Sequence, residues 1–347
     1  MYLSIIILIF LSFAITYFVT PKVIKFANKS GLVDNPKVRP HPAHIHQGII
    51  PRAGGLGLLL GIIIPSFLVF PFNRLLFGII VSTSLLVAIG LWDDKKDRSP
   101  YIRLFTNTLA ALIMILVGIN IPYITNPFGG IWHLDTIPFL SYLAAFIWIL
   151  WTTNIIGWSG GVDGQLPGFV AISAFIIGLL SLRFAAQDPK QIQVTYLSFI
   201  TGGAFLGFLP WNVYPQKIMP GYGGKTLAGF MLAVLSILTF SKLGTALLVL
   251  IIPMTDAVFM LSKRILSKKS PVLATNDHLH HHLLSLGWSK KKVAVFYWLI
   301  SLITGLIALS LNVKQKIFAM AVIIVVILGF IILIDYIRKL SKISQEE

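Results

Sequence analysis

The chain has 347 residues, of which 56% are hydrophobic and only 12% are charged. Ordinary soluble domains carry roughly 25% charged residues, so this composition excludes a typical soluble domain and indicates a membrane protein. The formal net charge of +16 would suggest nucleic acid as a partner of a soluble protein. Here we attribute it to membrane topology and expect no nucleic acid.

Apolar segments recur along the whole chain, each about long enough for an α-helix to cross a bilayer. Eleven can be drawn, at approximately 3–20, 49–72, 75–92, 104–120, 139–156, 166–183, 194–210, 224–240, 243–262, 295–312 and 317–337. The longest loop between them runs only from about 263 to 294. We therefore predict an all-α polytopic membrane protein with about eleven transmembrane helices, forming one domain over residues 1–347.

Lysine and arginine are unevenly divided between alternate loops. Of the 28 in the chain, 22 lie in one set of loops and six in the other. Because basic loops stay in the cytoplasm, this asymmetry predicts that the N-terminus lies outside and the C-terminus in the cytoplasm. We expect surrounding membrane lipids as partners, a location in the cytoplasmic (inner) membrane, and either a monomer or a homodimer.

The first predicted cytoplasmic loop contains Gly31-Leu-Val-Asp34 and ends at Pro51-Arg52-Ala-Gly54-Gly55. One interpretation is a basic anchor with glycines that allow close helix packing. The other is a collar in which Arg52 and the glycine backbone approach a phosphate. Both stay open from these residues alone.

The second predicted cytoplasmic loop begins with Asp93 and Asp94 at the end of an apolar segment. Ionised carboxylates at that depth cost several kcal/mol unless they are paired or hydrated. The stretch is either an ordinary loop kept in water by its lysines or a site where carboxylates hold a divalent cation against phosphate. The other acids on the same predicted side favour the second interpretation.

Two glycine-rich stretches follow. The third cytoplasmic loop, 154–168, holds five glycines around Asn154 and Asp163, too many for a plain helix interior, and we interpret it as a functional site. The fourth contains Gly221-Tyr222-Gly-Gly-Lys225, which opens a helix and can bind an anion without matching P-loop spacing.

The fifth cytoplasmic loop is the most basic. It contains Arg264 and a run of histidines at 278 and 280–282, and the preceding apolar segment contains Asp256, a lone carboxylate that we interpret as a site residue. The histidines could ligate zinc, but adjacent imidazoles cannot all face one ion and there is no cysteine partner. We prefer recognition of a nucleotide diphosphate by histidines beside lysine and arginine.

These motifs, in this order, resemble those of the polyprenyl-phosphate N-acetylhexosamine-1-phosphate transferases. This superfamily includes GlcNAc-1-phosphate transferases and phospho-MurNAc-pentapeptide transferases. The resemblance rests on the following stretches: Gly31 to Asp34, Pro51-Arg-x-Gly-Gly55, Leu91-x-Asp-Asp94, Asn154 to Gly164, and His278-x-His-His281. The Pro-Arg-x-Gly-Gly form is closer to the GlcNAc branch.

The resemblance implies transfer of a HexNAc-1-phosphate, in the first instance GlcNAc-1-phosphate, from a UDP-sugar to undecaprenyl or another polyprenyl phosphate. UMP is released, Mg²⁺ (or Mn²⁺) is the cofactor, and the reaction initiates a cell-envelope glycopolymer. The implied catalytic residues are Asp93, Asp94 and Asp163, and the implied metal ligands are Asp94 and Asn154. The expected substrate-binding residues are Arg52, Asn154, Lys225, Arg264, His278, His280 and His281.

The chain departs from the family pattern in several places. Gly157 and Gly160 stand where the family usually has Asn and Asp, and Thr275 stands where an Asp is frequent. The usual Gly-Asp-x-Gly-Ser turn has Tyr222 at its Asp, a residue associated with Mg²⁺, and Lys225 at its Ser. Two alternatives therefore stay open: a phospho-MurNAc-pentapeptide transferase-like enzyme, and a membrane protein that binds lipid phosphate or UDP-sugar without turnover.

Overall fold

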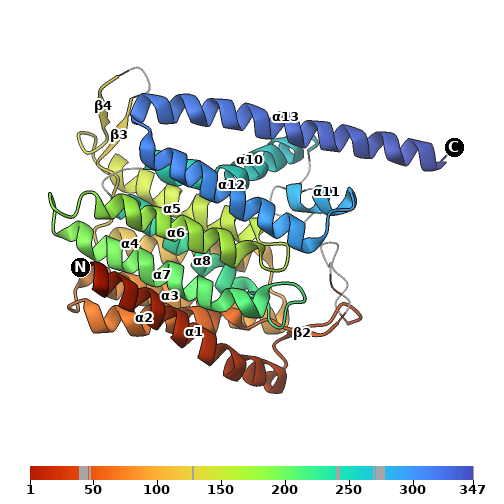
Figure 1. Cartoon of the computed structure of the whole chain (residues 1–347), viewed down its shortest axis with the longest axis horizontal. Helices are drawn as coiled ribbons and strands as arrows, with labels where there is room; N and C mark the ends of the chain where they lie inside the picture. Colours follow the sequence, from red (N-terminus) through yellow and green to blue (C-terminus); the bar gives the residue numbers. More distant parts are fainter. Residues whose placement is uncertain are drawn as a thin grey trace.

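The computed structural model describes residues 1–38, 46, 48–126, 129–239, 243–268, 270 and 278–346, with the backbone alone at 335 and 337–346. In this part of the chain, long helices lie side by side in one bundle (Figure 1). The helices are α1 Tyr2–Ser30, α2 Gly54–Val69, α3 Arg74–Lys96, α4 Pro100–Leu116, α5 Leu140–Ser159, α6 Gln165–Leu182, α7 Lys190–Asn212, α8 Gly221–Leu238, α9 Leu243–Val249, α10 Ile251–Leu266, α11 Leu279–Ser285, α12 Lys290–Ser310 and α13 Val313–Glu346.

The helical architecture follows from the apolar sequence, because a helix satisfies its own backbone hydrogen bonds where no water is present. Eight helices in the described part are long and apolar enough to cross a membrane, or nine if the bent pair α9 and α10 is one span. Helices α2 and α4 are apolar but shorter. Helices thus occupy all eleven segments expected from the sequence, and the protein is a polytopic membrane protein. The number of spans stays a prediction.

Helix α8 lies at the centre of the bundle and packs against α2, α3, α5 and α6. Glycines allow these helices to approach backbone to backbone. A Cβ on Gly55 of α2 would lie 2.6 Å from the nitrogen of Gly224, and one on Gly90 of α3 would overlap the Cα of Gly223. Contacts this close exclude side chains. They bring the start of α2 and the last turns of α3 against the start of α8.

The predicted span 243–262 is not one straight helix. It breaks at Leu250 into α9 and α10, which meet at a bend of 80°. Pro253 lies in the first turn of α10, where its missing N–H is not needed by the helix. Nothing in the sequence pattern indicates how sharp this bend is.

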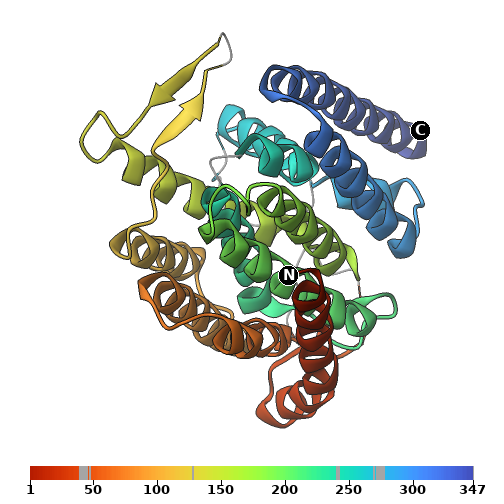
Figure 2. The same cartoon turned by 60° about the vertical axis from the view of Figure 1, so that its left-hand side comes forward.

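Two short antiparallel pairs were also not expected. Strand β1, Val33–Asp34, pairs with β2, Ile50–Pro51, and β3, Tyr123–Thr125, pairs with β4, Ile131–His133. The β3–β4 hairpin projects from the helices (Figure 2). The first pair matters for the site because it fixes the backbone at Asp34 and next to Arg52.

The bundle has two different ends. The N-terminus and the β3–β4 hairpin lie at one end, and β2 and α11 lie at the other (Figure 1). We call the second the polar end; there α3 and α5 end and α8 begins. Every site residue predicted from the sequence lies in an element that reaches this end or in a loop there.

Candidate active site

Asp93 and Asp94 lie in the last turn of α3, which continues to Lys96, and not in a loop as expected. Both are about 1% exposed. A helix C-terminus disfavours negative charge, and burial increases that cost, so both carboxylates need partners. The structure supplies a different set of partners to each.

Asp93 is held from one side only. Its Oδ1 accepts hydrogen bonds from the Nε of Arg103, at 2.8 Å, and from the backbone N–H of Arg98, at 3.1 Å. Its Oδ2 is buried and has no hydrogen-bond partner among the described residues. A buried carboxylate oxygen without a partner is costly, so this oxygen is available to a ligand.

Asp94 is held on both oxygens. Its Oδ1 lies 3.1 Å from both Nε and Nη2 of Arg52, and the backbone N–H of Tyr222 lies 3.0 Å from Oδ1 and 3.1 Å from Oδ2. This N–H belongs to the first turn of α8, where the helix dipole favours an anion. In this structure the glycine-rich turn donates a hydrogen bond to the Asp94 carboxylate, and the binding of a ligand anion by this turn stays a prediction.

Gly221 is required at this contact for two reasons. Its φ of +70° is one that side-chain-bearing residues rarely adopt. In addition, a Cβ there would overlap Oδ2 of Asp94. The start of α8 is also tied to the Arg52 segment, because the N–H groups of Gly54 and Gly55 donate to the carbonyls of Met219 and Pro220. We call Arg52, Asp93, Asp94, Arg103 and Tyr222 the carboxylate cluster.

Asn154 is linked to this cluster indirectly. It lies within α5 and not in a loop, because α5 continues to Ser159. Its Oδ1 accepts from Asn107 at 3.1 Å, and Asn107 in turn accepts from the Tyr222 hydroxyl at 3.2 Å. Hydrogen bonds therefore connect Asn154 through Asn107 to the hydroxyl of Tyr222, the residue whose backbone N–H donates to Asp94.

Asp163 belongs to a different part of the polar end. It follows α5 in the short segment 160–164, is 3% exposed, and accepts a hydrogen bond from Nε2 of Gln216 at 3.0 Å. The Nζ of Lys290, at the start of α12, lies 3.6 Å from the same oxygen. The described contacts tie Asp163 to the loop before α8 and to α12, and none of them joins it directly to Asp93 or Asp94.

The histidines form a second group, the histidine cluster, which consists of Asp256, His278, His280 and His281. Asp256 of α10 accepts from the N–H of Leu279, at 2.9 Å, and thereby caps α11, while its other oxygen lies 2.8 Å from Nδ1 of His278. The His278 and His280 rings stack with centroids 5.7 Å apart, and His280 and His281 lie 4.3 Å apart. Asp256 thus orients the run of histidines.

Two imidazoles of the histidine cluster, those of His280 and His281, have lowered pKa values. Burial, together with His278 and His282, lowers the pKa of His281 to about 4. Burial and the neighbouring imidazoles also lower the pKa of His280 well below its ordinary value. His280 packs against the segment before Asp163, since a Cβ on Gly161 would overlap its Nε2.

Lys225 lies one turn into α8. It interacts electrostatically with members of both clusters, namely Asp94, Arg52 and Arg103 of the first and His280 and His281 of the second, as well as with Asp34. Arg264 is also buried, in the last turn of α10. Its role toward a substrate stays a prediction.

The donor atoms do not fit the Mg²⁺ or Mn²⁺ site expected at Asp94 and Asn154. Both oxygens of Asp94 and the Oδ1 of Asn154 already accept hydrogen bonds. Among the described residues, no group of three or more acids or histidines could hold a metal ion. Arg52, Arg103 and Lys225 place positive charge beside the carboxylates, which opposes a second cation.

Sequence reasoning missed three members of the site. Arg103 and Asn107 lie on α4, and Tyr222 was noted only as a departure from the family pattern. A signal existed for Asn107, an amide inside an apolar segment, where polar residues are costly. The expected departure at Thr275 lies outside the described residues.

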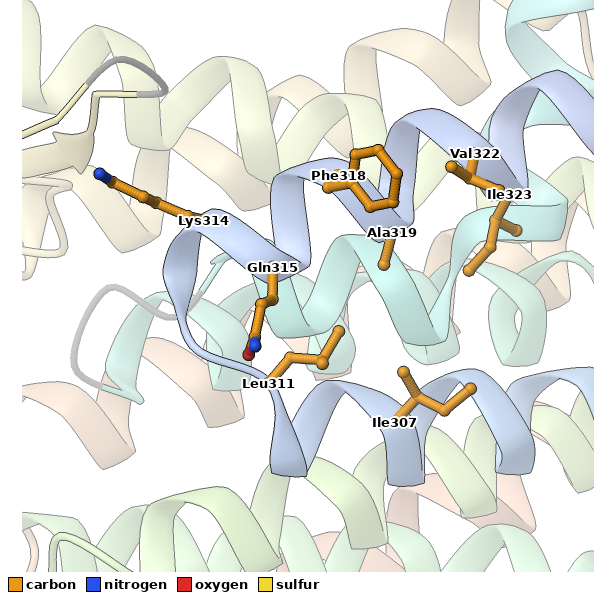
Figure 3. A pocket seen from close by; sticks show the side chains of 8 residues that line it. All are labelled: Ile307, Leu311, Lys314, Gln315, Phe318, Ala319, Val322 and Ile323. Carbon is orange, nitrogen blue, oxygen red and sulfur yellow. The ribbon is translucent and has the colours of Figure 1, made fainter.

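One hollow in the surface is unrelated to this chemistry. It has a volume of about 580 Å³ and lies between the end of α12 and the start of α13 (Figure 3). Its lining is almost entirely apolar, as expected of a groove that faces lipid tails. The residues with candidate catalytic chemistry lie elsewhere, at the polar end.

Fold and site together define a polytopic membrane protein with buried, ion-paired carboxylates and neutral histidines at one end of its bundle. The model of glycosyl transferase family 4 matches residues 76–240, from α3 to the end of α8. A probable undecaprenyl-phosphate N-acetylglucosaminyl 1-phosphate transferase of Bacillus subtilis is 27% identical over 302 residues, covering 85% of this chain and 81% of the relative.

Two further relatives agree. A decaprenyl-phosphate N-acetylglucosaminephosphotransferase of Mycobacterium tuberculosis is 29% identical, covering 82% of this chain and 77% of its own. An undecaprenyl-phosphate alpha-N-acetylglucosaminyl 1-phosphate transferase of Escherichia coli K12 is 29% identical over the same shares. The chain is therefore similar to glycosyl transferase family 4 over residues 76–240 and to these three transferases over most of its length.

Proposed function

We propose that the chain is an enzyme that transfers GlcNAc-1-phosphate from UDP-GlcNAc to a polyprenyl phosphate and releases UMP. The names of the relatives, which specify undecaprenyl or decaprenyl phosphate and N-acetylglucosamine, support the acceptor and the transferred group. The observation that carries the proposal is the carboxylate cluster. Its acids lie inside the segment that matches the family, and Asp93 keeps one oxygen free for a ligand.

The reaction is one displacement at phosphorus. An oxygen of the acceptor phosphate forms a bond to the β-phosphorus of UDP-GlcNAc, the atom that carries the sugar. The bond from this phosphorus to the bridging oxygen breaks, and that oxygen leaves with UMP. No covalent step on the protein is needed, so positioning and charge stabilisation supply most of the catalysis.

The two carboxylates have different roles in this scheme. Oδ2 of Asp93 accepts the proton of the acceptor phosphate, which keeps the attacking oxygen anionic, while Arg103 and the Arg98 N–H fix the carboxylate. Asp94 is a positioning residue, because it fastens Arg52 to the start of α8. The Mg²⁺ ion expected from the sequence has no part in these steps.

The remaining predicted residues belong to the donor side of the site. His278, His280 and His281, with Lys225 and Arg264, would contact the nucleotide diphosphate, while Asp163 would hold the segment that packs on His280. The Nδ1 of His280 is buried without a described hydrogen-bond partner, which leaves it able to bond a ligand. Asn154 would support Tyr222 and contact the sugar.

The site would face the cytoplasm. In support, 22 of the 28 lysines and arginines lie in loops that the predicted topology assigns to that side. The enzyme would then reside in the cytoplasmic membrane, with eleven spans and an outside N-terminus, and would begin a cell-envelope glycopolymer.

The proposal is tested by UMP release from UDP-GlcNAc by the purified full chain with undecaprenyl phosphate in detergent, against UDP-MurNAc-pentapeptide as the alternative donor. We expect release with UDP-GlcNAc that requires the acceptor lipid. Release with UDP-MurNAc-pentapeptide alone would overturn the assigned sugar. No release with either donor, while nucleotide still binds, would overturn the enzymatic role.

A further inference from the structure

Every described acid of the polar end has a cationic or histidine partner. The pairs are Asp34 with His46, Asp93 and Asp97 with Arg103, Asp94 with Arg52, Asp163 with Lys290 and Asp256 with His278. Each of these carboxylates is therefore already in contact with a basic side chain of the protein. A ligand that carries negative charge needs a cation that is not used in this way.

Lys225 has the properties of that cation. Within the described ranges it makes no hydrogen bond or ion pair, although it lies among charged groups that interact with it. It lies one turn along α8 from Tyr222, whose N–H donates to Asp94 of the carboxylate cluster, where an acceptor phosphate would meet Asp93. Its charge also acts on the imidazoles of His280 and His281. An anion between the two clusters would be adjacent to Lys225.

The surroundings of Lys225 also explain why a divalent ion is not needed there. The oxygens of Asp94 and Asn154 are occupied by hydrogen bonds, and the Tyr222 side chain donates to Asn107 and to the carbonyl of Arg103. A metal ion would have to displace Arg52 from Asp94 and lie beside Lys225. Both changes cost electrostatic energy.

We propose that the Lys225 ammonium, and not a divalent cation, neutralises the diphosphate of the donor, so that the chain binds UDP-GlcNAc and releases UMP without Mg²⁺. This inference rests on the proposed function. An ammonium at this place stabilises the negative charge that develops on the bridging oxygen as it leaves with UMP, and the atoms balance as in the reaction given above. Lys225 is then a binding and catalytic residue that α8 contributes to the site.

The first test needs no variant. UMP release by the full chain is measured in excess EDTA and in millimolar MgCl₂. We expect rates that agree within about twofold. Turnover in MgCl₂ that disappears in EDTA would overturn the inference and leave the proposed function intact, whereas no turnover in either condition would count against the proposed function itself.

The second test reads binding separately from activity. Titration calorimetry with UDP-GlcNAc in EDTA compares the wild-type chain with Lys225→Ser, Lys225→Arg and the exposed control Lys217→Ser. Since a hydrogen bond to a charged group contributes about 1.5–3 kcal/mol, Lys225→Ser should weaken binding roughly 10- to 100-fold. Lys225→Arg should restore most of it, and Lys217→Ser should stay within about twofold.

A double variant asks whether Lys225 and Tyr222 stand in place of a metal site. Tyr222→Asp with Lys225→Ser introduces the residues that the family pattern leads one to expect. We expect its UDP-GlcNAc affinity to depend on Mn²⁺, with Mn²⁺ binding detectable by electron paramagnetic resonance, while the wild-type chain shows neither. Tight Mn²⁺ binding by the wild-type chain, or Lys225→Ser with unchanged affinity in EDTA, would contradict the proposal.

Discussion

The carboxylate cluster and the histidine cluster differ in how their buried ionisable side chains are accommodated. The acids are ion-paired with arginines from other segments, with Arg52 lying 42 residues from Asp94 in the sequence. Burial lowers the pKa of His280 and of His281, while His278 has Asp256 as its carboxylate partner. The difference indicates that a site for anions can combine ion-paired groups with neutral hydrogen-bonding groups.

The largest expected effect comes from removing the free oxygen of the carboxylate cluster. Asp93→Asn keeps the shape of the side chain but cannot accept the acceptor's proton. We expect UMP release to fall by roughly 10²–10⁴-fold, the usual contribution of a general base, with UDP-GlcNAc affinity nearly unchanged. Asp97→Asn is the matched control, because Asp97 shares Arg103 but its side chain is 53% exposed. Equal losses in the two variants would remove Asp93 from its role.

The contact between Gly221 and Asp94 tests how far the carboxylate cluster depends on the start of α8. Gly221→Ala adds strain at a positive φ and a clash with Asp94, and should lower stability by roughly 2–5 kcal/mol in thermal unfolding in detergent. At Gly287, φ is +84° and no described atom lies within 4 Å of the place that a Cβ would take. Gly287→Ala should therefore cost only about 1–2 kcal/mol. Similar losses of stability in Gly221→Ala and Gly287→Ala would contradict a close contact between Gly221 and Asp94.

The histidine cluster can be perturbed without touching the acids. Gly161→Ala places a methyl group against Nε2 of His280, whereas Gly157→Ala, in the same segment of chain, meets no described atom within 4 Å. Since a displacement of about 1 Å can cost up to 10²-fold in rate, Gly161→Ala should slow UMP release by roughly 10- to 100-fold. Gly157→Ala should change it less than twofold. A reversed order would contradict the packing of His280 on this segment.

The smallest expected effect is a dependence of stability on pH. The pKa of His281 is about 4 in the folded chain, below its ordinary value of 6.5, so the unfolded chain binds more protons between these values. This contribution to stability is complete above about pH 6.5 and is lost as the pH falls toward 4. The groups that act on His281 are His278, His282, Asp256 and Lys225. Thermal unfolding from pH 7 to 4 should show a shallower decline in His281→Gln, and an identical decline would contradict a neutral His281.

The sequence predicted the helical membrane fold and most of the polar end, because apolar length and rare charges in membrane segments are strong local signals. It placed Asp93, Asp94 and Asn154 in loops, whereas α3 and α5 continue through them, since another helix, α4, contributes Arg103 to Asp93 and Asn107 to Asn154. The bend between α9 and α10 and the pairing of β1 with β2 likewise depend on tertiary packing. Periodicity within one segment cannot report such contacts.

The missing family Asp at position 222 was visible in the sequence, but its consequence was not. Only the structure shows that the backbone N–H of Tyr222 binds Asp94 while its hydroxyl reaches Asn107. Only the structure shows that the charge of Lys225 acts on members of two clusters that are far apart in the chain. The sequence shows which family residue is absent at position 222, and the structure shows which groups Tyr222 and Lys225 contact or act on instead.

The central claim, transfer of a sugar together with its phosphate, is tested most directly with UDP-GlcNAc that carries ³²P at the β-phosphate and ³H in the sugar. The full chain is incubated with undecaprenyl phosphate, and the lipid and aqueous phases are separated. We predict that both labels enter the lipid phase in a 1:1 ratio while unlabelled UMP remains in water. Tritium in the lipid with ³²P left behind in UDP would show transfer of the sugar alone and would contradict the claim.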